Sequence, residues 1–347
     1  MKKTIKLSLL LVSTALLQAC IITEPVSKAE LKATENSAYT SDGRLFVIGE
    51  NKDKQSWIFE IKKTSTNTYY HEPYLRGTQY GTTNGYINEQ ASGDSCRFAG
   101  LTAQGTLLYA TCIRSGGILN LGAESVSLYQ VETKSGQEFV KTGLMTDENF
   151  EKSDSEIDFD PNWFMANGMA VDSNGHVYIS NSKASLAPNR DAISKVIIDN
   201  KDNGKNLAFS HQTWISGAEF FPNGVQIEGD VLYYAAGSDI LKTRIQADGK
   251  AGEVRLHFNG SNLATIDDFA IEQGYIAYAK LPAAGSVVIL KPASFHRTAR
   301  HLTTVVMPVI PSSIVYQKDL PAGNPLFDEG NLLVTSFFSG GLFRIEF

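Results

Sequence analysis

The chain has 347 residues and a formal net charge of −6, with 20% charged and 42% hydrophobic residues. This length lies near the upper range of a single domain, and all-β barrels and propellers reach it as one unit. The acidic balance argues against a nucleic-acid partner, because such a partner requires a basic face on the protein.

The first 19 residues have the features of an export signal. Lys2, Lys3 and Lys6 form a basic start, and a short apolar segment follows over residues 7–17. This segment is too short for a membrane-spanning helix, and its flanking residues are those of a signal peptide. No later apolar stretch is long enough to span a bilayer. We therefore predict that residues 1–19 are a signal peptide. Its removal takes away three lysines, so the net charge of −6 becomes −9.

The segment ends in Leu17-Gln18-Ala19-Cys20, which resembles the lipoprotein box of bacteria. In that box the cysteine is acylated and becomes the mature N-terminus, and lipoprotein modification supplies the several acyl chains that stable anchoring needs. We predict lipidation at Cys20, a lipidated tether over residues 20–34, and a place in the bacterial cell envelope facing the periplasm or the exterior. A plain secretory signal with a chance cysteine is the alternative.

Strand signals dominate the rest of the chain. Short runs of β-branched and aromatic residues alternate with turn signals, and the pattern returns at periods of roughly 40 to 50 residues, as in propeller blades. We predict an all-β protein, a six-bladed β-propeller over residues 35–347. The six predicted strand pairs cover residues 36–41 with 44–48, 97–102 with 107–110, 168–172 with 177–180, 224–227 with 231–234, 268–271 with 275–278, and 313–316 with 331–335. Further strands are predicted at residues 57–61, 127–131, 192–198, 240–245, 287–290 and 342–347.

Two segments interrupt this pattern. Residues 68–93 are rich in tyrosine, and residues 146–160 are rich in acidic side chains. We predict both as surface loops between blades, with a place at the mouth of the central channel as the alternative. The acidic segment lacks a glycine at the turn position, so it is not an EF-hand loop.

Two cysteines remain after Cys20, and an exported protein can form disulfides. Gly105 marks a turn near the midpoint between Cys96 and Cys112, with an apolar strand on either side. In such a hairpin the two cysteines face each other, or nearly so. We predict a structural disulfide between them, and the alternative is two buried thiols.

Three oxygen-bearing residues begin similar strands in different units. Asn167, Asn223 and Asp267 each precede a short apolar strand, a polar turn and a second strand. A ring of such units can bring its ligands together on one central metal ion. Calcium takes oxygen ligands, whereas zinc prefers His and Cys, and the chain has no His/Cys cluster. Taken singly, either Asn-Gly dipeptide is also consistent with a turn, and the Asp with a solvated cap.

Four segments resemble the senescence-marker/gluconolactonase family: Glu35-Asn36-Ser37, Ala166-Asn167-Gly168-Met169, Pro222-Asn223-Gly224 and Asp267-Asp268-Phe269. Paraoxonases and squid-type phosphotriesterases share its six-bladed architecture. The resemblance implies a calcium or similar hard divalent cation in the central tunnel, held by Glu35, Asn167, Asn223 and Asp267.

The chain also departs from the family pattern. Asn36-Ser37 stands where Gly-Pro is usual, and Asp268 stands where glycine is usual, which is a paraoxonase-like feature. The paraoxonase histidine dyad cannot be placed on any of the six histidines, so none receives a catalytic role. Ser312-Ser313 occupies the corresponding position of the sixth unit, and we assign it to packing.

A bound cation can polarise a carbonyl or phosphoryl oxygen, and a carboxylate beside it can act as base or nucleophile. Asp267 is the candidate for this catalytic role and Asp268 the alternate. We expect a calcium-dependent hydrolase that is anchored to the membrane through Cys20 and acts on a lactone or an ester. Organophosphates are a third substrate class that the same chemistry would serve. A non-catalytic propeller lipoprotein that binds a ligand or protein in the envelope is the alternative. A condensing enzyme of the strictosidine-synthase type shares the fold without the metal, and the Asn/Asp set counts against it.

Overall fold

The structure is a computed structural model that describes residues 21–22, 31, 33–63, 69–77, 96–115, 123–152, 159–183, 191–199, 206–217, 221–260, 265–281, 285–316, 332–336 and 341–345. The predicted signal peptide, Cys20 and most of the predicted tether lie outside these residues. Within them, no helix has both the length and the apolar character that crossing a bilayer would require.

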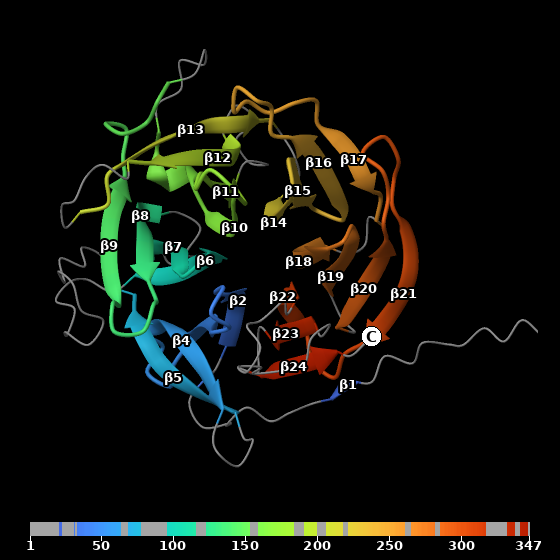
Figure 1. Cartoon of the computed structure of the whole chain (residues 1–347), viewed down its shortest axis with the longest axis horizontal. Helices are drawn as coiled ribbons and strands as arrows, with labels where there is room; N and C mark the ends of the chain where they lie inside the picture. The colour runs from blue at the N-terminus through green and yellow to red at the C-terminus, as the bar shows by residue number, and fades with distance from the viewer. Residues whose placement is uncertain are drawn as a thin grey trace, which may run out of the picture.

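The described residues form six four-stranded antiparallel sheets arranged around a centre, so the prediction of a six-bladed β-propeller is confirmed. In Figure 1 the innermost strand of each sheet lies nearest the middle of the ring, and neighbouring inner strands contact one another. Blade 1 contains β2 (Ala33–Tyr39), β3 (Leu45–Glu50), β4 (Ser56–Lys63) and β5 (Tyr69–Arg76). Blade 2 contains β6 (Arg97–Gln104), β7 (Leu107–Ser115), β8 (Ala123–Glu132) and β9 (Phe139–Met145).

The next three blades repeat this order from the centre outward. Blade 3 contains β10 (Ala166–Val171), β11 (Val177–Asn181), β12 (Asp191–Ile198) and β13 (Phe209–Ser216), preceded by a short 3₁₀ turn, η1 (Pro161–Trp163). Blade 4 contains β14 (Pro222–Glu228), β15 (Val231–Ala236), β16 (Asp239–Arg244) and β17 (Arg255–Phe258). Blade 5 contains β18 (Thr265–Glu272), β19 (Tyr275–Leu281), β20 (Ser286–Lys291) and β21 (Arg300–Val306).

Blade 6 joins the two ends of the chain. Its inner strands are β22 (Pro311–Tyr316), β23 (Leu332–Ser336) and β24 (Leu342–Ile345). The outermost strand is β1 (Ile21–Ile22), which pairs antiparallel with β24 so that Ile21 faces Ile345. Ile21 and Ile22 of the predicted tether thus belong to the last blade (Figure 1). Ala33 and Thr34, at the other end of the predicted tether, belong to β2 of blade 1.

All six predicted strand pairs and the further strands appear in the structure, with boundaries shifted by a few residues. The prediction of a loop from residue 68 onward is wrong for β5, which is the outer strand of blade 1. Pro73 lies within β5 opposite Phe59, and an edge strand tolerates a proline because its outer side needs no ladder donor. Most of the remaining tyrosine-rich segment and part of the acidic segment lie outside the described residues.

The core is divided among the interfaces between blades. Six clusters of buried apolar side chains each join two neighbouring blades, and the sixth joins blade 6 to blade 1. The second strands β11, β15 and β23 are buried at every position, because neighbouring blades cover both of their faces. The apolar side chains of these strands therefore contribute to two interfaces at once.

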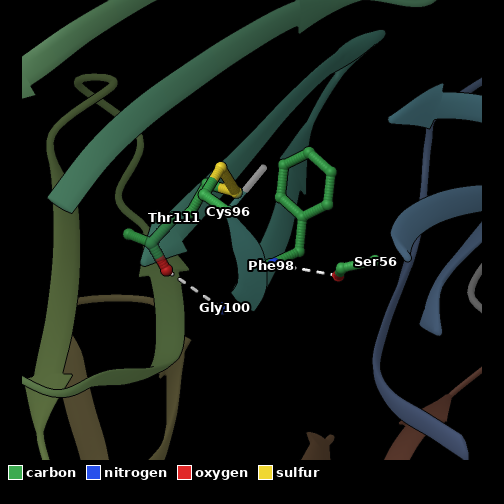
Figure 2. The surroundings of a disulfide bond; sticks show 6 residues. Ser56, Cys96, Phe98, Gly100 and Thr111 are labelled. Carbon is green, nitrogen blue, oxygen red and sulfur yellow. Dashed lines mark hydrogen bonds between the residues drawn. A yellow bond between two sulfur atoms is a disulfide. The ribbon is translucent and has the colours of Figure 1, made fainter. Parts of the chain in front are cut away.

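The predicted disulfide between Cys96 and Cys112 is confirmed, and the Cα atoms of the two cysteines are 5.6 Å apart. It ties the start of β6 to β7, where Phe98 pairs with Cys112 (Figure 2). The Phe98 amide donates to Ser56 Oγ in blade 1 at 3.0 Å, so the bridge lies where blades 1 and 2 meet. Both cysteines are buried.

Removing the disulfide should destabilise the protein by about 3 kcal/mol, because the bridge closes a loop of 16 residues in the unfolded chain. The Cys96→Ser/Cys112→Ser double variant should therefore show a lower free energy of unfolding in urea. The wild type measured under reducing conditions should shift by a similar amount. Equal stability of the oxidised wild type and the double variant would contradict this prediction.

Candidate functional site

Every inner strand carries a bulge at the same height. In each blade the register shifts so that two residues of the inner strand lie opposite one residue of the second strand. We call these six dipeptides the bulge ring. Its members are Glu35-Asn36, Ala99-Gly100, Asn167-Gly168, Asn223-Gly224, Asp267-Asp268 and Ser312-Ser313. The two Asn-Gly dipeptides are thus strand bulges, and their alternative interpretation as turns is wrong.

The second residue of each dipeptide lies against the next blade. A Cβ atom at Gly168 would lie 2.5 Å from the Asn223 carbonyl oxygen, and one at Gly224 would lie 2.5 Å from Asp268 Oδ1. A Cβ atom at Gly100 would be equally close to the Asn167 carbonyl oxygen. Glycine is the second residue of the dipeptide in blades 2, 3 and 4 because the neighbouring inner strand leaves no room for a side chain.

Where the second residue has a side chain, it forms a hydrogen bond across the blade interface. Asn36 Nδ2 donates to the Ala99 carbonyl, and Ser313 Oγ donates to Asp268 Oδ2 at 2.6 Å. Hydroxyl groups on the second strands stabilise the bulges themselves. Thr111 accepts from the Gly100 amide at 3.0 Å (Figure 2), and Ser180 and Thr335 do the same in blades 3 and 6.

The first residues of blades 4, 5 and 6 are in direct contact. Asp267 is at the centre: Asn223 Nδ2 donates to its Oδ1 at 2.9 Å, and Ser312 Oγ donates to its Oδ2 at 3.2 Å. Both oxygens of the carboxylate therefore have a partner from a neighbouring blade. Asn223 is buried, whereas Asp267 is partly exposed.

Glu35 brings a second carboxylate to the ring. Its side chain keeps 19% of its surface accessible, and Arg97 from β6 lies 2.5 Å from its Oε1. Arg97 Nε also lies 3.5 Å from Glu50 Oε1, so the guanidinium lies between two carboxylates. The backbone carbonyl of Glu35 accepts from Thr335 Oγ1 at 2.6 Å, which attaches the strand to blade 6.

Asn167 is partly exposed on β10, and its Nδ2 donates to Ser182 Oγ at 3.4 Å. Ser182 in turn donates to the Pro222 carbonyl at 2.7 Å, immediately before Asn223. The predicted metal ligands thus lie in adjacent blades at one height, except that blade 2 contributes Ala99, which has no side-chain donor. Only Asn223 and Asp267 are hydrogen-bonded to each other.

The carboxyl groups of the ring have shifted pKa values. Burial raises the pKa of Glu35 to about 7, against the lowering effect of Arg97, and the charge of Asp267 raises it further. Burial and the charge of Asp268 raise the pKa of Asp267 to about 6, while the bonds from Ser312 and Asn223 oppose the shift. Burial also raises the pKa of Asp268 to about 6. Three acids held together in this way favour either a proton or a cation.

These shifts predict a pH-dependent stability. A carboxyl whose pKa is raised on folding binds protons more readily in the native state, so the free energy of unfolding falls as pH rises from about 4 to 7. Asp267→Asn removes one such group. With chelator present, the free energy of unfolding of the variant, relative to that of the wild type, should rise by on the order of 2 kcal/mol between about pH 4.5 and pH 7.5. The neighbouring charges of Glu35, Asp268 and Arg97 remain in both proteins. Urea unfolding at the two pH values tests this, and parallel changes in the two proteins would contradict it.

The structure separates the two predicted catalytic acids. Asp267 contacts the side chains of two neighbouring ring members, whereas Asp268 is buried and bonded to Ser313. Ser312, assigned to packing, is instead a partner of Asp267, and only its equivalence to Asn167 and Asn223 could have indicated this. The six histidines lie elsewhere, in outer strands or turns; His211, for example, is buried among Phe150, Phe159 and Phe209.

The donor chemistry of the ring fits a hard cation. Two carboxylates, two amide carbonyls and a hydroxyl can supply oxygen ligands, and burial raises the pKa of both carboxyl groups, which a nearby cation would lower. Among the described residues, no three His, Cys, Asp or Glu side chains form a metal-binding cluster. The predicted set is of a different kind, because half of its members are Asn.

No family model matches the sequence, and no curated protein matches it. Among solved structures, the fold is similar to that of a gluconolactonase from Xanthomonas campestris, with 12% sequence identity and a TM-score of 0.52 over 94% of this chain and 89% of that one. For the periplasmic gluconolactonase of Pseudomonas aeruginosa, the identity is 12% and the TM-score 0.45, over 78% of this chain and 69% of that one. For a virginiamycin B lyase from Staphylococcus aureus, the sequence identity is 8% and the TM-score 0.48, over 95% of this chain and 100% of that one. At these identities the likeness shows a shared fold, and the structural neighbours of this propeller include gluconolactonases.

Proposed function

We propose that this protein is a lactone or ester hydrolase that uses a hard divalent cation. The oxygen donors of the bulge ring favour calcium as that cation. The observation that supports this most is the position of Asp267. Its carboxylate is held from both sides by Asn223 and Ser312, in the same ring as Glu35, and its pKa is raised to about 6. A carboxylate with such a pKa can accept and release a proton near neutral pH.

Glu35, Asn167, Asn223 and Asp267 would hold the cation. When bound, it would polarise a substrate carbonyl and lower the pKa of a water molecule. The chain itself orients the groups: Asn223 and Ser312 fix both oxygens of Asp267, and Arg97 pairs with Glu35. Asp267 is the proposed base, because it is the partly exposed acid of the pair and neighbouring blades orient both of its oxygens. Asp268 is turned to Ser313 and supports the blade interface.

The substrate class rests on the sequence resemblance and the fold together. The neighbour from Xanthomonas campestris is by name a gluconolactonase, and we extend the lactone class to this chain as a proposal. The fold alone does not establish the substrate class, since one fold serves many reactions.

The test uses purified protein without residues 1–20 on a panel of lactones and aryl esters. We expect hydrolysis that a chelator abolishes and calcium restores. Asp248→Asn, in an exposed turn, is the matched control and should keep full activity. A protein that holds calcium but hydrolyses no member of the panel, and that retains an envelope partner, would favour the alternative of a non-catalytic binding propeller.

We also propose that Cys20 carries the lipid that attaches the propeller to the membrane. The motif Leu17-Gln18-Ala19-Cys20 supports this. Metabolic labelling with a radioactive fatty acid should mark the wild type and leave Cys20→Ser unmarked, with the variant released from the membrane fraction. Equal labelling of both proteins would contradict the assignment.

A further inference from the structure

On the hairpin-turn side of the bulge ring, the centre of the propeller contains a cavity of about 360 Å³, which we call the chamber. All six inner strands contribute to its wall, each with residues that follow the bulge. Ser37, Leu101, Met169, Gln226, Ala270 and Ile314 are examples, one from each blade. At its rim the turns of blades 1 and 2 are joined, because the Ser41 amide donates to the Gly105 carbonyl at 2.8 Å.

The chamber is uncharged. None of the described residues that line it is acidic or basic, whereas the ring beside it contains Glu35, Asp267 and Asp268. Its polar groups are hydroxyls and one amide, from Ser37, Tyr39, Thr102, Gln226 and Tyr316, among others. The remaining wall is apolar. No ligand of the proposed metal site lines the chamber, so the channel has two chemically distinct parts.

Hydrogen bonding at the ring end of the chamber fixes the role of Ser37. Ser313 has a single hydroxyl proton, and it donates that proton to Asp268 Oδ2 at 2.6 Å. Ser37 Oγ lies 3.4 Å from Ser313 Oγ, so in this pair Ser37 must be the donor. The lone pairs of Ser37 then remain as acceptors on the chamber wall. A molecule in the chamber would therefore meet an acceptor at this end.

The volume lies in the range of small-molecule sites and exceeds what a few structural waters need. A charged molecule would lose its hydration there without a counter-charge, and a wholly apolar one would leave the hydroxyls unpaired. Tyr39 and Tyr316, from adjacent blades, add flat apolar surface with a polar edge. We propose that the chamber binds an uncharged, hydroxylated ring compound, with a ligand hydroxyl donating to Ser37.

Binding of phenyl β-glucoside and phenyl β-glucuronide to the purified protein tests this, because the two probes share one scaffold and differ by a carboxylate. Titration calorimetry or ligand-observed NMR should show binding of the glucoside, with the glucuronide weaker by on the order of tenfold or more. Thr102→Phe should fill the chamber and abolish binding. Ala247→Leu, in an exposed turn, is the control and should bind as the wild type does. If Thr102→Phe does not fold, Gln226→Leu replaces it and should weaken binding.

Equal affinity for the two probes, no binding of either, or unchanged binding in a folded Thr102→Phe protein would overturn the proposal. The chamber does not depend on the proposed hydrolase. Binding of the glucoside should persist in Asp267→Asn and in the presence of chelator. Loss of hydrolysis with retained binding, or the reverse, would therefore show which of the two proposals fails.

Discussion

Gly168→Ala should destabilise the protein by about 3 to 5 kcal/mol or prevent folding, which is at the extreme of single substitutions. The new Cβ atom would lie 2.5 Å from the Asn223 carbonyl oxygen, 2.6 Å from the Val225 nitrogen and 2.7 Å from the Gly224 Cα atom. All three are backbone atoms of the next inner strand, so no side-chain rotation can relieve the overlap. The whole of blade 4 would have to move away from blade 3.

The matched control is Gly136→Ala, in the turn between β8 and β9. Gly136 has a φ of +76°, and a Cβ atom there would meet no atom within 4 Å. This substitution should cost about 1 to 2 kcal/mol, from backbone strain alone. Urea unfolding of both variants distinguishes crowding from strain. If the two substitutions cost the same, the inner strands do not approach one another as closely as the bulge ring requires.

Asp267→Asn should lower kcat/KM on the best lactone or ester by about a thousandfold, because it removes the proposed base and one proposed cation ligand. Its melting temperature should hold or rise in chelator, since a poorly compensated buried charge is removed. Asp268→Asn should change the rate by less than about tenfold, because Asp268 is buried against Gly224 and its carboxylate accepts from Ser313 at the blade interface.

The pair of variants tests the assignment because the two acids are adjacent in sequence and have similar pKa values. Rates are measured at saturating calcium, and stability is measured separately by thermal unfolding. Inactivation by Asp268→Asn with a fully active Asp267→Asn protein would reverse the roles assigned here. Equal inactivation by both would indicate that the bulge ring acts as one unit.

Local sequence patterns were sufficient to predict most of the fold. The hairpins are recognisable because Gly43, Gly105, Gly175 and Gly229 take positive φ at turns between apolar runs. The disulfide could be predicted because Gly105 lies midway between Cys96 and Cys112. These features depend on residues close in sequence, so a single amino-acid sequence is enough to identify them.

Features that depend on contacts between blades could not be predicted. Whether Asn167-Gly168 is a turn or a bulge depends on how closely β14 approaches β10, which no local pattern records. The pairing of Ser312 with Asp267 joins residues of different blades in the same way. The closure by β1 joins Ile21 to Ile345, at opposite ends of the chain. In β5, Pro73 is typical of a loop, and only its place at the sheet edge makes a strand possible.

Calorimetric titration of the chelator-treated protein with calcium tests the central claim most directly. We predict a single site per chain, with affinity weakened at least about tenfold in Glu35→Gln and Asp267→Asn and unchanged in Asp248→Asn. The same calcium should raise the melting temperature of the wild type. Absence of any bound calcium, or binding that is equally strong in Asp267→Asn, would contradict the assignment of the bulge ring as a cation site.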